Sequence, residues 1–398
     1  MEKLALTGAA NRNARMNHGD IHALHYATRK PVRLRWEDGI VVSLEPGDAS
    51  LSGGVWLAPA LFDPQVNGYG GVDFQQDGLT LDQLLSAVRQ LRRDGCARIL
   101  YTLITDEWPR ILARVRHVRQ LREQSAELRH GIAGFHIEGP FLSAEPGFKG
   151  AHNAEVMRDA TTADIEDLRA ATGDDPVLLT LAPERGGALD AIRIATSLGM
   201  KVSLGHTNAS ADVMRAAVSS GATAFTHLGN ALPQQLDRHD NVLWRVVDTP
   251  GLVAGIIPDT IHVSPMLFRL LHRALPPERI YYTTDAMSAA GAPPGRYTIG
   301  AMELEVGADQ IVRLPGKTNF AGSALKPIEG VFRAAKMLAR PWQDVWDHFS
   351  VRPAQLMGLG EPLAPGQPAD FCRLAFDADL RLKNLDTFVG GESPRTAS

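Results

Sequence analysis

The chain contains few cysteines and little excess charge. Only Cys96 and Cys372 occur among 398 residues, far apart and both in apolar stretches, which argues against a disulfide scaffold and for a reducing compartment. The formal net charge is −4, so no overall field attracts nucleic acid or an anionic membrane. Recognition of an anion must therefore depend on particular residues.

Long apolar runs are absent as well. No stretch approaches the roughly 18 apolar residues of a membrane span, and the N-terminal LALTGAA is too short for the apolar region of a secretory signal. With 44% hydrophobic and 22% charged residues, the chain can bury a sizeable core. We therefore predict a cytoplasmic globular protein whose partners include neither membrane nor nucleic acid.

The middle of the chain alternates short apolar segments with amphipathic ones. In residues 80–94, Leu81, Leu84, Val88 and Leu91 recur at helical spacing, and the apolar segment ARILYTLIT follows directly. Such alternation predicts parallel strands joined by helices, and eight units of this kind predict a (β/α)8 TIM barrel. The eight strand segments are LAPALFDPQ, ARILYTLIT, GIAGFHIE, VLLTLA, KVSLGH, TAFTH, LVAGII and RIYYTTD.

Both ends of the chain have a different character. Residues 1–58 read as short strands, with the hairpin signal Glu37-Asp38-Gly39 inside VRLRWEDGIVVSL. GAMELEVGADQIVRL and the closing PLAPGQPADFCRL also read as strand-bearing. We predict an α/β fold with a small β-sandwich domain built from both chain ends, residues 1–58 and 305–398, beside a barrel of residues 59–340.

Four strand segments stop at a residue type that binds metals or transfers protons. In GFHIEGPFLS the Gly139-Pro140 pair cannot continue the strand, so Glu138 is left at its carboxyl end. His206, His227 and Asp285 end three later segments in the same way. Chemistry in a TIM barrel sits at this edge, and three protein ligands with an open water position are typical of a catalytic zinc site. We predict that Glu138, His206 and His227 bind the metal.

The end of the first strand indicates how many metals bind. Barrels with two metals usually carry His-x-His there, because alternate residues point inward, but this chain has Gln65 and Asn67. A neutral carboxamide is a weak ligand for a transition metal. We predict one divalent ion per chain, with zinc as the first choice and iron, manganese or cobalt as alternatives.

Four further residues have both a functional and an ordinary interpretation. Asp285 is a candidate acid and base beside the metal, or it caps the segment that follows. His136 either supports Glu138 or is a hydrogen-bonded core histidine. His152, in FKGAHN, lies on a loop suited to contact substrate. Arg238, in PQQLDRHDN, suits a phosphate, although a solvated loop arginine is the common case.

Taken together, the motifs resemble those of the N-acetylglucosamine-6-phosphate deacetylases of the amidohydrolase superfamily, in its single-metal branch. The matching stretches run in the family's order over residues 58–325, and the tail PLAPGQPADF resembles the superfamily's closing strand. They are FDPQVNGYGG, TLIT, HIEGPFL, KGAHN, GHTNA, THLGNAL, DTIHV, TTDAM and FAGSAL.

The resemblance implies a role for each matching position. Glu138, His206 and His227 would bind the metal, and Asp285 would donate and accept the proton, with His152 assisting on the substrate. The family forms homodimers in which the neighbouring chain completes the phosphate site, at Arg238 and His262. The implied substrate contacts are Ala151, His152, Asn230, Ala231, Arg238, Asp259, Thr260, Ile261, His262, Phe320, Ala321 and Gly322.

Three departures from the family pattern lie on the substrate side. Gly229 stands where the family usually has an aromatic residue, Thr260 where it has glycine, and Glu145-Pro146-Gly147 lengthens a loop by two residues. Our hypothesis is hydrolysis of the N-acetyl group of N-acetylglucosamine 6-phosphate to glucosamine 6-phosphate and acetate. The alternatives are an amidohydrolase that acts on a different, unphosphorylated N-acyl compound, and a barrel kept as a non-catalytic scaffold.

Overall fold

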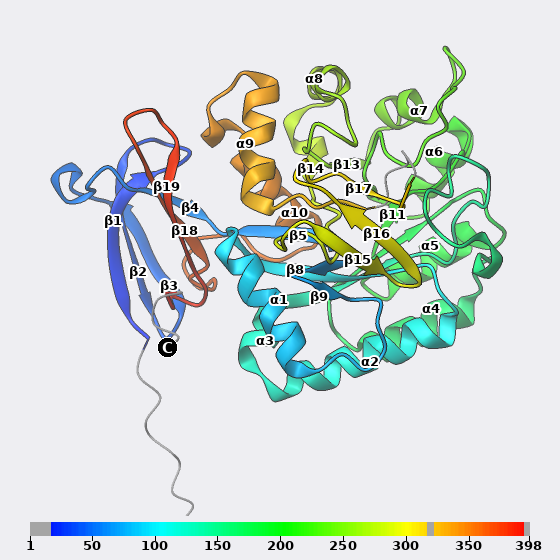
Figure 1. The fold of residues 1–398 in the computed structure, drawn as a ribbon, viewed down its shortest axis with the longest axis horizontal. Coiled ribbons are helices and arrows are strands. Elements are labelled where there is room, and N and C mark those ends of the chain that lie inside the picture. The colour runs from blue at the N-terminus through cyan, green and yellow to red at the C-terminus, as the bar shows by residue number, and fades with distance from the viewer. Residues whose placement is uncertain (1–16, 317–321, 394–398) are drawn as a thin grey trace, which may run out of the picture.

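The computed structural model describes residues 17–316 and 322–393, and two units lie side by side in it (Figure 1). The larger is an eight-stranded parallel sheet curved into a nearly closed barrel and surrounded by helices, which confirms the predicted fold class. Its strands run in chain order around the sheet. They are β5 (Leu61–Val66), β8 (Cys96–Ile104), β9 (Ile132–Glu138), β10 (Val177–Leu181), β11 (Lys201–Leu204), β12 (Ala224–Phe225), β13 (Val253–Ile256) and β14 (Ile280–Tyr282).

The helices form because their sequences bury one face and cap their ends. In α1 (Leu81–Arg93) the Thr80 hydroxyl caps the first turn with Gln83, and Leu84, Val88 and Leu91 face the core. The remaining helices are α2 (Trp108–Gln124), α3 (Ala126–Gly131), α4 (Thr162–Thr172), α5 (Ala188–Ser197), α6 (Ala211–Ser219), α7 (Val242–Asp248), α8 (Pro265–Ala274), α9 (Pro327–Leu338) and α10 (Val351–Leu356), with 3-10 turns at Ala49–Leu51, Ala154–Val156, Pro277–Arg279, Trp342–Asp344 and Trp346–Phe349.

The smaller unit is a six-stranded sheet made from both ends of the described chain (Figure 1). Its order is β19-β18-β4-β1-β2-β3, with β1 and β4 parallel and the other pairs antiparallel. Trp36 packs against Phe371 and Phe388, so residues distant in sequence share one small core. The strands are β1 (Gly19–His25), β2 (Pro31–Glu37), β3 (Ile40–Pro46), β4 (Trp56–Pro59), β18 (Phe371–Phe376) and β19 (Leu382–Phe388).

The strands that follow the barrel do not join this sheet. They form a separate antiparallel sheet of β15 (Gly295–Ile299), β16 (Met302–Val306) and β17 (Val312–Arg313). A two-stranded ribbon, β6 (Gly68–Tyr69) and β7 (Val72–Asp73), follows β5. The domain boundaries drawn from the sequence stay a prediction. Within the described ranges no helix is long and apolar enough to cross a membrane, and Cys96 and Cys372 are buried and free.

Candidate metal centre

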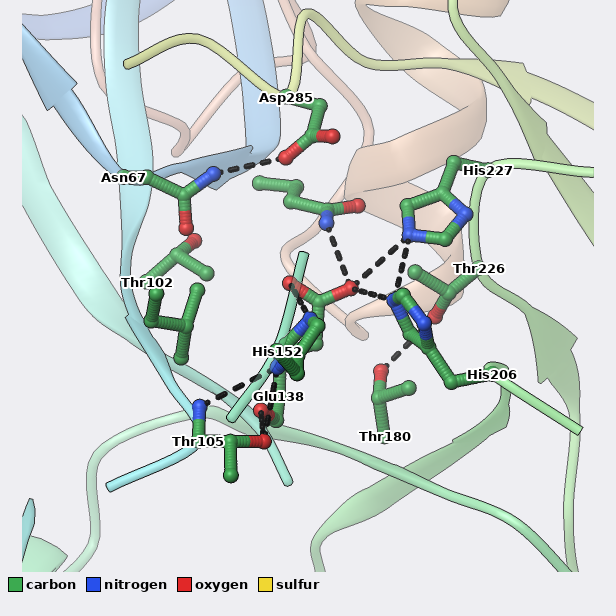
Figure 2. A network of polar contacts seen from close by, with 12 residues as sticks. Asn67, Thr102, Thr105, Glu138, His152, Thr180, His206, Thr226, His227 and Asp285 are labelled. Atoms are coloured by element: carbon green, nitrogen blue, oxygen red, sulfur yellow. Dashed lines mark hydrogen bonds and ion pairs between the residues drawn. The ribbon is translucent and has the colours of Figure 1, made fainter. Parts of the chain in front are cut away.

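Three side chains from different strands converge at one edge of the barrel (Figure 2). Glu138 is the last residue of β9, while His206 and His227 each follow a strand end by two residues. Glu138 Oε1 lies 3.2 Å from His206 Nε2 and 3.0 Å from His227 Nε2, and the two nitrogens are 3.1 Å apart. All three side chains are buried. The set predicted from the sequence is therefore brought together.

The geometry of these three atoms fits a small divalent cation. Zinc bonds of about 2.0–2.1 Å in a tetrahedron place neighbouring ligand atoms roughly 3.3 Å apart, close to the three separations seen here. His206 Nδ1 lies 2.9 Å from the carbonyl oxygen of Phe148, so the Nδ1 proton is donated there and the Nε2 lone pair faces the other two ligand candidates. Donor type, spacing and tautomer all agree with a metal site.

The backbone at these strand ends is locally strained. His206, His227 and Asp285 have φ values of 49°, 33° and 51°, in the left-handed region that non-glycine residues seldom adopt. Such residues cost about 1–3 kcal/mol each and persist where the surroundings hold them, often at functional sites. Because two ligand candidates and the acid/base candidate share this conformation, the strain marks the same edge of the barrel as the side chains do.

Asp285 lies beside the converging ligand candidates, on the segment after β14 (Figure 2). Its Oδ1 accepts a hydrogen bond of 2.7 Å from Asn67 Nδ2. Burial and the negative charge of Glu138 raise the pKa of Asp285 to about 7. The pKa of Glu138 itself is lowered well below its usual value, because its contacts with the imidazoles of His206 and His227 outweigh the effect of its burial. One carboxylate is thus held ionised and the other can exchange a proton near neutral pH.

Gln65 occupies the place where a two-metal barrel would carry a histidine. Its Nε2 donates to Glu138 Oε1 at 3.0 Å, and its side chain is buried. A carboxylate oxygen only accepts hydrogen bonds, so the amide must turn its nitrogen toward Glu138. Gln65 therefore supports a ligand candidate and does not offer an oxygen of its own at that contact.

His152 reaches the site from the loop that follows β9. Its Nε2 lies 3.9 Å from Glu138 Oε2, and its ring packs on His206 at 4.3 Å between centroids. The backbone amide of Thr105 donates to His152 Nδ1 at 3.4 Å, and the Thr105 hydroxyl lies 2.8 Å from the same nitrogen. Burial, with the charge of His206, lowers the pKa of His152 to about 3. The ring is neutral, and with Nδ1 accepting, its proton lies on Nε2.

His136 is a hydrogen-bonded core histidine, the second of the two interpretations given above. Its Nε2 contacts Thr180 Oγ1 at 2.7 Å, and hydroxyls continue from Thr180 to Thr226 at 2.8 Å and from Thr226 to Ser203 at 2.7 Å. Burial lowers the pKa of His136 to about 4. It is a neutral, hydrogen-bonded histidine in a polar layer inside the barrel. Sequence reasoning missed this layer, since each hydroxyl residue reads as an ordinary strand residue.

The residues implied for substrate contact divide into two groups. Asp259 accepts hydrogen bonds from the amides of Ile261 and His262 and contacts His262 Nδ1 at 2.5 Å. The charge of His262 partly offsets the rise in the pKa of Asp285, so this turn lies near Asp285. Thr260, with φ of 67°, is exposed in the same turn.

The second group is spread over several other loops of the barrel. The Asn230 amide donates to the carbonyl of His227, and Ala231 has φ of 51°, so both belong to the turn that follows this ligand candidate. Ala151 and Arg238 are exposed, on the loops before His152 and before α7. Gly322 is described with φ of 74°. Phe320 and Ala321 lie outside the described residues.

A buried carboxylate that the sequence did not single out also belongs to this edge. Asp63, in β5, is fully buried and contacts Thr283 and Thr284, which lead to Asp285. The available signal was an aspartate inside an apolar strand followed by proline, in LFDPQ, and two threonines just before Asp285. Neither feature by itself indicates a contact between segments some 220 residues apart.

Comparison with known proteins gives the family. No family model matches the chain. The N-acetylglucosamine-6-phosphate deacetylase of Bos taurus is 32% identical over 85% of this chain and 83% of its own length. The N-acetylgalactosamine-6-phosphate deacetylase of Escherichia coli O157:H7 is 29% identical over 89% and 92%.

A solved structure agrees with the sequence relatives. It is an aspartate-to-alanine variant of the Mycobacterium smegmatis N-acetyl-D-glucosamine-6-phosphate deacetylase in complex with N-acetyl-D-glucosamine-6-phosphate. It superposes with a TM-score of 0.83 at 29% identity and covers 95% of this chain and 99% of its own. Sequence, fold and site agree, and the chain belongs to the N-acetylglucosamine-6-phosphate deacetylase family of amidohydrolases.

Proposed function

We propose that this protein hydrolyses the N-acetyl group of N-acetylglucosamine 6-phosphate to give glucosamine 6-phosphate and acetate. The observation that carries the proposal is the convergence of Glu138, His206 and His227 with Asp285 at the carboxyl edge of the barrel. Relatives over most of the chain are deacetylases of this sugar phosphate. A non-catalytic scaffold has no use for such a buried charged cluster, since burying it costs stability.

Glu138, His206 and His227 would hold one divalent cation, zinc in our proposal, with iron, manganese or cobalt as the alternatives that the same ligands suit. When bound, the cation would polarise the acetyl carbonyl and make a nearby water more acidic. Gln65 keeps Glu138 oriented toward the two imidazoles, and the Phe148 carbonyl does the same for His206.

The remaining steps fall to the chain's own acid and base. Asp285, with a pKa raised to about 7, accepts a proton from the attacking water while the water oxygen bonds to the acetyl carbon. As the carbon–nitrogen bond breaks, Asp285 returns that proton to the sugar nitrogen. Asn67 holds one carboxylate oxygen of Asp285 and leaves the other free for this exchange. His152 Nε2, which carries the ring proton, donates to a substrate oxygen.

The phosphate would be bound at Arg238 and His262, with a second copy of the chain completing the site. Arg238 is exposed, as a residue that meets a neighbouring chain must be in an isolated chain. Trp244, Met266 and Leu270 are exposed by 44%, 66% and 40% on α7 and α8, the helices after the paired strands β12 and β13. These apolar side chains support a homodimer in a cytoplasmic enzyme.

A second candidate substrate is the galactose epimer or another N-acyl compound. It is favoured by the 29% identity with an N-acetylgalactosamine-6-phosphate deacetylase and by the residues at two substrate-side positions. At Gly229, where the family usually carries an aromatic residue, an added Cβ would lie only 3.2 Å from Val263 and 3.4 Å from Leu267, and Thr260 adds a side chain where the family usually has none. Both changes alter the walls of the site and leave the ligand candidates untouched.

Acetate release from N-acetylglucosamine 6-phosphate tests the proposal. N-acetylgalactosamine 6-phosphate and unphosphorylated N-acetylglucosamine are run in parallel, with the metal content of the same sample measured. We expect about one metal per chain and efficient release from the glucosamine phosphate ester. Release only from the epimer, or equally from the unphosphorylated sugar, would replace the substrate. A metal-loaded protein that cleaves none of the three would refute the function.

A further inference from the structure

The barrel closes between its first and last strands, and this seam lies next to the site. β5 contains Pro64, which has no amide hydrogen to donate across the seam. Backbone contact across the seam is made at the end of β5. It consists of the parallel bridge between Val66 and Ala286 and of the Asn67 amide, which donates to the Ala286 carbonyl at 2.7 Å. Ala286 directly follows Asp285, so the conformation of Asp285 depends on how the seam is held.

The side chain of Asp63 supplies further contacts across the seam. Its Oδ1 accepts from the Thr283 hydroxyl at 2.6 Å and from the Gln65 amide at 3.2 Å. Its Oδ2 accepts from the amide and the hydroxyl of Thr284, at 3.1 and 2.5 Å. Each oxygen thus has two donors, the arrangement that suits an ionised carboxylate. All four donors are neutral, so a costly buried charge is held in place by hydrogen bonds alone.

These contacts fix the backbone on both sides of Asp285. The Thr284 hydroxyl donates to Asp63 and accepts from the Ala286 amide at 3.1 Å, so a single side chain ties together the residues before and after Asp285. Between them Asp285 adopts a φ of 51°, which has to be imposed by its neighbours. Asn67, from the same edge of the barrel as Asp63, then holds the carboxylate of Asp285 (Figure 2).

The same carboxylate also reaches the ligand candidates. Asp63 holds the backbone amide of Gln65, and the side chain of Gln65 donates to Glu138. Two chains of hydrogen bonds therefore start at the Asp63 carboxylate, one leading to Asp285 and the other to Glu138. Three donors next to Asp285 contact Asp63, namely the Thr283 hydroxyl and the amide and hydroxyl of Thr284, whereas a single donor, the Gln65 amide, leads toward Glu138. Loss of Asp63 should therefore affect Asp285 most.

We propose that Asp63 is a positioning residue for the hydrolysis: it closes the seam between β5 and β14 and thereby sets the backbone, and so the carboxylate direction, of Asp285. The inference rests on the proposed function. Asp63 does not touch the reacting atoms and acts through Thr283, Thr284 and Asp285. The loss of such a supporting contact at a catalytic site typically costs about 10–100-fold in activity.

The test compares D63N and T284V with the control T284S, in the metal-loaded full-length protein. Asparagine has one acceptor oxygen in place of two, valine removes the hydroxyl, and serine keeps both donors of Thr284. We expect D63N to lower kcat by about 10–100-fold with KM and metal content near wild type. We expect T284V to lower kcat to a smaller extent and T284S to behave as wild type.

The decisive experiment introduces D63N into the D285N variant and compares kcat of the double variant with that of D285N. If Asp63 acts through Asp285, the second substitution should lower the residual kcat by less than about threefold, because there is no acid/base left to position. Equal losses in both backgrounds, or a loss of metal that accounts for the activity, would overturn the inference. If D63N does not fold, equal kcat values of T284V and T284S would overturn it. If the wild-type protein is inactive on all three sugars, the proposed function is refuted, and the positioning role of Asp63 is refuted with it.

Discussion

Replacing Asp285 by asparagine should make the protein inactive and, without metal, more stable. Asparagine can turn its oxygen toward Asn67 Nδ2, so the 2.7 Å contact survives while the proton acceptor is lost. General acid/base catalysis contributes about 10²–10⁴-fold, so kcat should fall by that factor, or by about 3–5 kcal/mol in activation free energy. Metal content should stay near one per chain, because Asp285 lies outside the convergent set of ligand candidates.

The effect of D285N on stability follows from the raised pKa of Asp285. In the folded, metal-free protein this pKa is about 7, whereas in the unfolded chain it is about 4. The folded state therefore loses stability as pH rises from about 4 to about 7, and the full cost, on the order of 4 kcal/mol, is present above pH 7. D285N removes this cost. The apo variant should melt at a higher temperature than apo wild type at pH 8 and at nearly the same temperature at pH 4.5.

Two assays decide the matter: single-substrate kinetics of the metal-loaded proteins, and thermal unfolding of the metal-free proteins at both pH values. D309N serves as the control, because Asp309 is an exposed carboxylate paired with Arg313 and should change neither kcat nor the pH dependence. Turnover within threefold of wild type in D285N would refute the catalytic role. A melting temperature that does not rise at pH 8 would refute the argument from burial and from the charge of Glu138.

Three further predictions concern the metal, the phosphate and acid stability. H206N should fold, as judged by circular dichroism, yet retain well under one metal per chain by elemental analysis; full metal content would contradict the ligand assignment. R238A should raise KM for the phosphorylated sugar at least tenfold with little change in kcat, and leave the unphosphorylated sugar unaffected, since the proposed role of Arg238 is to bind the phosphate and not to take part in the bond cleavage. Burial lowers the pKa of His272 to about 3 in the folded protein. As pH falls below about 6.5, the unfolded chain therefore binds a proton at His272 before the folded protein does, and folding stability declines by up to about 1.4 kcal/mol per pH unit. H272Q should flatten this decline, measured by urea unfolding between pH 7 and 4.5; an unchanged slope would show that other groups dominate.

The ligand candidates were accessible from the sequence because of a property of parallel sheets. Each of Glu138, His206 and His227 ends an apolar run, and the carboxyl ends of parallel strands meet at one edge. The eight strand segments were found for the same reason, since strands buried on both faces read as short continuous apolar runs. Their roles in binding a metal stay a prediction, as does the identity of the ion, which these ligand types do not fix.

Other features depend on contacts that no local pattern encodes. The strands of residues 295–313 read like those of the chain ends, yet they pair with one another, because strand propensity does not specify a partner. Arg238 is exposed in the single chain, and its contact with a phosphate stays a prediction, because its sequence context does not specify a partner.

The sequence by itself determined the order of the strands, the edge at which chemistry occurs and the residue types gathered there, because each of these follows from local periodicity and from where an apolar run stops. Only the tertiary structure decided how those residues are held. The left-handed backbone of Asp285 and the burial of Asp63 against Thr283 and Thr284 lie where the first and last strands meet. That meeting closes a loop of some 220 residues, and packing of the whole barrel selects it.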